Sequence, residues 1–253
     1  RPWPERALRA LLAIVLPRDD VRYRGRPMMQ SYGAFSPHFA EQNAAHYRSA
    51  RGPDFVLFRV DPIDGRFPAL CDGRVWRELL RRYEVASDLG NDLLLRRMNS
   101  NRTLHAGRPL QVRAVWNSRI AVPPTRGGLI WCRVKISRNL AGQLAALLYK
   151  LPPVMLEVTT PDRSRRFRFV PGAGESGFLL SPQVLSKEEF ASLMRPGADA
   201  VASETGQAAD VAFIRFSTRA DSFYVESIML EFERVTVSQP HRGPLRHVVR
   251  SSE

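Results

Sequence analysis

Cysteine is scarce in this sequence, and the spacing of the cysteines argues against a structural metal site. The 253 residues hold two, Cys71 and Cys132, without the CxxC or Cys/His spacing that zinc ligands show. Cys132 alternates in phase with apolar neighbours, which indicates a buried free thiol. A Cys71–Cys132 disulfide is the alternative that the sequence leaves open.

Familiar catalytic motifs are also missing. The chain has no P-loop, no dinucleotide-binding glycine fingerprint, no HExxH and no GxSxG. These absences argue against the common nucleotide-dependent, metalloprotease and α/β-hydrolase classes. We therefore expect neither a cofactor nor a resident metal.

Long hydrophobic runs are absent as well. Residues 7–16 form an apolar stretch, but Arg9 interrupts it and Pro17 ends it. About ten residues are half of what a membrane-spanning helix needs. Residues 1–26 therefore predict a membrane-proximal basic and apolar segment, either an interfacial helix or the end of a span that lies upstream. An ordinary amphipathic helix docked on the domain is the alternative.

Acidic residues are too few to balance the basic ones, and the net charge is +13. Only Lys135, Lys150 and Lys187 are lysines, so arginine supplies nearly all of the excess. Arginine-rich codon usage would explain this charge, and so would an anionic partner. Because acids interrupt most basic runs, we expect an anionic membrane surface and no nucleic acid. We also expect salt-sensitive binding to anionic vesicles that is lost when residues 1–26 are deleted.

The residues that are present predict an α+β protein with two regions that differ in the spacing of their apolar residues. Residues 27–105 predict a small α/β region, with a helix that begins at Ser36-Pro37, a strand, a loop, a second helix and a hairpin. Residues 106–237 alternate apolar and polar side chains, which predicts an antiparallel, jelly-roll-like β-sandwich with inserted helices. One inserted helix, over residues 139–150, carries its leucines on one face, and a capping box at Ser186–Glu189 predicts the start of a second. Residues 238–253 are expected to form a disordered tail.

Three carboxylates crowd the loop between the predicted strand and the second helix. Asp61, Asp64 and Asp72 lie in a stretch rich in proline and glycine. Paired acids on a loop can perform acid/base catalysis or bind a cation, so these are weak catalytic candidates. Aspartates that cap turns by accepting backbone N–H bonds are the alternative.

Trp131 is the most suggestive aromatic residue of the β-rich region. On the expected strand it points away from the apolar face and shares its side with Arg133 and Lys135. An exposed indole beside cations can stack on a sugar ring while the charged groups bind its hydroxyls. These three residues are therefore candidate glycan ligands. A Trp131 covered by a helix or by the α/β region is the alternative.

Three segments of the sequence, and the order of the elements expected in them, resemble parts of known membrane proteins. SYGAFSPHFAEQNAAHY (31–47), PDFVLFRVDPIDGRFPALCDG (53–73) and the hairpin region 76–97 resemble the C-terminal, extracytoplasmic region of uncharacterised bacterial polytopic membrane proteins. They are also similar to the soluble parts of integral-membrane glycosyltransferases that use lipid-linked sugars. The resemblance implies the periplasmic face of the inner membrane, with the rest of a larger membrane protein as partner. The catalytic acid of those enzymes lies in an early loop between membrane helices, so no functional residue carries over.

These features lead us to expect an extracytoplasmic domain of a multi-pass membrane protein. Its function would be that of a non-catalytic glycan-binding or regulatory module in cell-envelope polysaccharide metabolism. A soluble enzyme that acts on a sugar or phosphate ligand through Asp61, Asp64 and Asp72 is the alternative. A nucleic-acid-binding protein, suggested by charge alone, is a weaker one.

Overall fold

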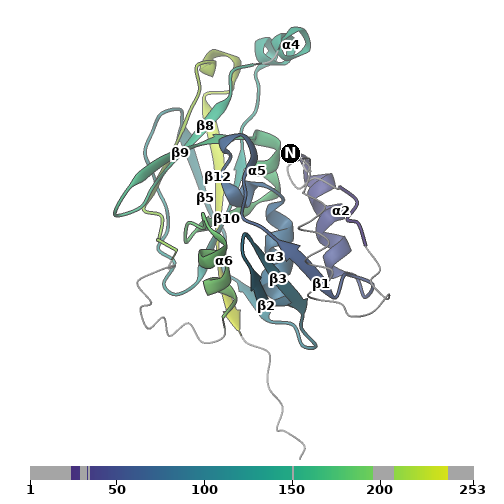
Figure 1. Ribbon diagram of the computed structural model, residues 1–253. Coiled ribbons are helices and arrows are strands. Elements are labelled where there is room, and N and C mark those ends of the chain that lie inside the picture. The colour runs from purple at the N-terminus through teal and green to yellow at the C-terminus, as the bar shows by residue number, and fades with distance from the viewer. Residues whose placement is uncertain (1–23, 29–32, 34, 150, 196–207, 239–253) are drawn as a thin grey trace, which may run out of the picture.

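The computed structural model describes residues 24–28, 33, 35–149, 151–195 and 208–238. Most of the segment expected at residues 1–26, and of the tail expected at 238–253, lies outside these residues. The fold is α+β, with three antiparallel sheets in the described part of the chain (Figure 1). The predicted fold class is confirmed.

The α/β region forms around a three-stranded sheet in the order β1-β3-β2. Its elements are α2 (Pro37–Arg48), β1 (Phe55–Phe58), the 3-10 turns η2 (Ile63–Gly65) and η3 (Pro68–Leu70), α3 (Gly73–Arg82), β2 (Tyr83–Leu89) and β3 (Asp92–Arg97). The Ser36 hydroxyl caps α2 by accepting from the Phe39 N–H, as the Ser-Pro start predicts. Phe58 packs against Trp76 of α3, with ring centroids 5.5 Å apart, and this contact fixes the sheet on the helix.

The β-rich region forms two further sheets. One has the order β10-β7-β12-β4, with β5 also paired to β12, and the other has the order β6-β11-β8-β9. The strands are β4 (Thr103–Ala106), β5 (Leu110–Val115), β6 (Ile120–Ala121), β7 (Leu129–Lys135), β8 (Val154–Thr159), β9 (Ser164–Phe169), β10 (Phe178–Ser181), β11 (Phe213–Ser217) and β12 (Ser227–Ser238). Phe169 of one sheet packs on Phe178 of the other at 6.2 Å between centroids, so the sheets face each other as a sandwich.

Helices are inserted between these strands. They are α4 (Leu140–Leu148), α5 (Pro171–Ser176) and α6 (Lys187–Met194), with the 3-10 turn η4 (Asp221–Phe223) before β12. The capping box predicted at the start of α6 is present, because Ser186 and Glu189 bond each other's backbone N–H groups. The leucines of α4 point to solvent rather than into the core.

One hydrophobic core runs through both regions. It joins Leu79 of α3 and Leu95 of β3 to Cys132 of β7 and Phe216 of β11, all buried. Cys71 and Cys132 are free thiols, so the disulfide alternative is not formed. Within the described residues, no helix has both the length and the apolar character needed to cross a bilayer.

Candidate functional site

The expectation that Trp131 is exposed is wrong, because only 4% of its surface is accessible. Its strand alternates as predicted, with Cys132 and Val134 on the inner face and Trp131 on the outer face. The outer face is covered at this point by Arg77 of α3, whose guanidinium lies 5.6 Å from the indole centroid, and by Gly177 after α5, where a Cβ atom would lie 3.2 Å from the indole Cδ1. Arg77 also binds Glu233, the residue paired with Trp131 on β12, at 2.8 Å. A sugar ring therefore has no open indole face to stack on.

The two cations that share the outer face with Trp131 remain exposed. Arg133 binds Glu231 of the neighbouring strand at 3.2 Å, so its guanidinium is partly neutralised. Lys135 makes no ion pair within the described residues. Because Arg77 and Gly177 cover the indole, these three residues do not form one open surface.

The three loop carboxylates have three different surroundings. Asp61 is exposed, and Asp64 lies 3.6 Å from Arg66 and 3.3 Å from Arg168. Asp72 is buried at the N-terminus of α3. Across the described ranges, no group of three or more His, Cys, Asp or Glu side chains is placed to hold a metal ion.

Asp72 differs from the other two acids because its carboxyl group is buried. Its Oδ2 accepts from the buried Asn43 amide at 2.6 Å and lies 3.5 Å from Arg26, whereas its Oδ1 is buried without a hydrogen-bond partner. Burial raises the pKa of this carboxyl to about 6, although Asn43 and Arg26 both favour the charged form. Asp72 can therefore exchange a proton near neutral pH, but it lies in the interior.

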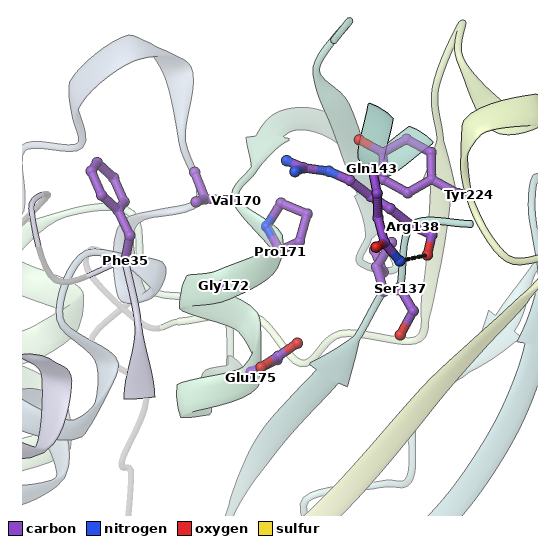
Figure 2. Close-up of a pocket in the computed structure, with 10 residues that line it drawn as sticks. Phe35, Ser137, Arg138, Gln143, Val170, Pro171, Gly172, Glu175 and Tyr224 are labelled. Atoms are coloured by element: carbon purple, nitrogen blue, oxygen red, sulfur yellow. Dashed lines mark hydrogen bonds between the residues drawn. The ribbon is translucent and has the colours of Figure 1, made fainter. Parts of the chain in front are cut away.

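A groove of about 520 Å³ opens just beyond the strand that carries Trp131. Figure 2 shows its walls, which come from four separate stretches of the chain. The lining residues are Phe35 before α2, Ile136, Ser137 and Arg138 after β7, Gln143 of α4, Val170, Pro171, Gly172 and Glu175 at α5, and Tyr224 after η4.

Local backbone geometry brings these stretches together. The β-bridge between Arg138 and Tyr224 holds the end of β7 beside the chain that leads into β12. On the other side, a Cβ atom on Gly172 would lie 2.2 Å from the Phe35 carbonyl oxygen, so only glycine permits this close approach. The aromatic residue before α2 is thereby placed at the edge of the groove.

The groove carries one cation and one anion that are not paired with each other. The Arg138 side chain extends toward Pro171, and the Glu175 carboxylate lies further along α5 (Figure 2). Neither side chain makes an ion pair within the described part of the chain. Gln143 donates only a long bond of 3.4 Å to the Arg138 carbonyl. Guanidinium, amide, carboxylate and hydroxyl groups are therefore available to a ligand in a partly apolar groove.

Sequence reasoning missed these residues. Arg138 is three residues beyond Lys135, a predicted ligand, but nothing in the alternation distinguishes it from other surface arginines. The Gly172-Ala-Gly174 pair was the available signal, since glycine often marks a close backbone approach.

No known protein family, curated protein or solved structure matches this chain.

Proposed function

We propose that this chain is the extracytoplasmic part of a multi-pass inner-membrane protein and binds glycans of the cell envelope without catalysis. Its place on the periplasmic face is proposed on the resemblance of residues 31–47, 53–73 and 76–97. The glycan site is assigned to the groove between β7 and α5. One observation carries this assignment, namely the unpaired Arg138 and Glu175 beside the apolar surfaces of Phe35 and Pro171.

A glycan fits this set of groups better than a simple anion does. Sugar hydroxyls both donate and accept, so they can satisfy the donor-only Arg138, the acceptor-only Glu175 and the amide of Gln143 together. The apolar face of a sugar ring can lie on Phe35 or Pro171. An anion would bind Arg138, but Glu175 would repel it.

If glycans bind in the groove, removal of either the Arg138 or the Glu175 charge should lower the affinity for them. In the full chain, Arg138→Gln or Glu175→Gln should weaken glycan binding about tenfold or more, because a hydrogen bond to a charged group contributes about 1.5–3 kcal/mol. Ligands would be found on an array of bacterial envelope oligosaccharides and measured by calorimetry. Arg133→Gln is the matched control, since Arg133 lies within β7 outside the groove and this variant should bind as the unaltered chain does. Equal losses for Arg133→Gln and Arg138→Gln, or no bound oligosaccharide, would contradict the proposal.

A second candidate function is the enzyme alternative, which the chemistry of Asp72 favours. A buried carboxyl whose pKa is raised to about 6 can act as a general acid or base near neutral pH. Turnover of nitrophenyl glycosides or nitrophenyl phosphate that Asp72→Asn abolishes would support this function. No turnover, or turnover that survives Asp72→Asn, would contradict this function and would show that Asp72 has only a structural role at the contact between α2 and α3.

A further inference from the structure

Helix α4 presents an apolar face to solvent. The exposed fractions are 79% for Leu140, 65% for Leu144, 82% for Leu147 and 83% for Leu148. Tyr149, which follows the helix, is 52% exposed. Soluble proteins rarely leave four neighbouring leucines uncovered, so this face is expected to bind something apolar.

The helix is held in this orientation by specific packing. Its opposite side lies on η4, where Gly142 approaches the Phe223 carbonyl so closely that a Cβ atom would lie 1.9 Å from it. Asn139 caps the helix by accepting from the Gly142 N–H at 2.8 Å and donates to the Ser222 carbonyl at 2.7 Å. Figure 1 shows α4 at one extremity of the molecule, beyond the ends of the sandwich strands. Its leucines therefore project away from the body of the protein.

The charge around this helix is positive. From Lys135 to Leu156 the sequence holds Lys135, Arg138 and Lys150 and no acidic residue. The underlying segment holds the exposed Arg219 and the exposed acids Asp221 and Glu226, so it lowers this excess by one charge. The surrounding chain therefore keeps a positive excess, and an apolar face in a positively charged region is complementary to a surface that is apolar inside and anionic at its edge.

We propose that α4 docks this protein on an anionic lipid bilayer, with its leucines among the acyl chains and Tyr149 at the headgroup level. The nine-residue helix lies in the interface and does not span it. This docking is separate from glycan binding and holds whether or not the groove has a ligand. Because Gln143 of α4 also lines the groove, docking would hold the groove at the membrane surface.

The charges favour a bilayer over a second copy of this chain as the occupant. Each copy carries a net charge of +13, so a symmetric contact between two α4 helices would bring two positively charged molecules together. Like charges placed together at an interface oppose association. An anionic bilayer supplies the opposite charge as well as the apolar interior.

Vesicle binding tests the proposal directly. The full chain would be co-sedimented with vesicles of equal parts phosphatidylcholine and phosphatidylglycerol, and with vesicles of phosphatidylcholine alone. Leu144→Gln combined with Leu148→Gln should weaken binding to the anionic vesicles at least tenfold, because two apolar contacts with the acyl chains are lost. Phe55→Gln combined with Leu110→Gln is the matched control, since both residues are exposed far from α4 in sequence. This control carries the same net charge and should bind as the unaltered chain does.

A local probe separates α4 from residues 1–26, which are also expected to contact membranes. An environment-sensitive nitrobenzoxadiazole dye would be attached at Leu148→Cys, or at Leu110→Cys as the control, in a chain that carries Cys71→Ser. Its emission should rise on the anionic vesicles only from the α4 position. An unchanged emission at that position, or equal binding by the two double variants, would overturn the proposal. A dimer that dissociates with the α4 variant, while vesicle binding is unchanged, would overturn it in favour of a second copy.

Discussion

Replacing Trp131 by alanine should lower the free energy of unfolding by about 3–5 kcal/mol, as for other large aromatic residues removed from a core. The indole is 4% exposed and lies between β7 and Arg77 of α3. The α5–β10 junction also covers it, since a Cβ atom on Gly177 would lie 3.2 Å from the indole Cδ1. Truncation would therefore leave a cavity between the sandwich and the helical layer. Urea unfolding followed by far-ultraviolet circular dichroism measures the loss.

The control for this experiment is Trp116, a half-buried tryptophan at the end of the sandwich. It packs on Tyr224 and donates to the Val225 carbonyl, and its truncation should cost less stability because solvent already reaches the ring. If Trp131→Ala costs less than about 1 kcal/mol, the indole is not a core residue. That result would restore the stacking surface first expected from the sequence.

Asp72→Asn should remove a dependence of stability on pH. Since burial raises the pKa of Asp72 from 3.8 to about 6, the folded protein binds a proton that the unfolded chain releases between these values. Stability from this group is therefore present below pH 4, falls as the pH rises from about 4 to 6, and stays low above. Two pKa units correspond to about 3 kcal/mol at most. Asparagine cannot ionise and tolerates the left-handed φ of 66° at this position.

Denaturant midpoints measured from pH 4 to pH 7 test this expectation. The difference in stability between the Asp72→Asn and unaltered chains should grow as the pH rises, because only the unaltered chain pays the cost of a buried charge. Asp64→Asn is the control, since it makes the same chemical change at an exposed position and leaves Asp72, with the pH dependence that Asp72 causes, in place. A difference that shrinks with rising pH would show that the ionised Asp72 is stabilised by Asn43 and Arg26.

Local patterns in the sequence predicted the elements of this fold well. The start of α2 at Ser36-Pro37, the capping box of α6 and the alternation of β7 depend on neighbours within a few residues. Such short-range interactions can be predicted from the identities of neighbouring residues. The α+β class and the antiparallel sheets follow from these elements.

The segments that cover each face of a strand or helix could not be predicted in the same way. Alternation shows that Trp131 and Cys132 lie on opposite faces, but the outer face is covered by Arg77 and Gly177, which are distant in sequence. The same gap affects α4, where the leucines share a face but that face points outward. The groove was missed for a related reason, because its residues come from four stretches without a common spacing.

The long strand β12 has a consequence for how the chain acquires its structure during synthesis. It forms hydrogen-bonded pairs with β7 on one side and with β5 and β4 on the other, through residues 227–238. A ribosome releases β4, β5 and β7 well before this strand, so the edges that pair with β12 stay unpaired until residues 227–238 have been made. Non-local pairing of this kind slows folding, and open edges of nascent strands attract other chains. Efficient production should therefore depend on chaperone holding until the last strand inserts into the middle of the sheet.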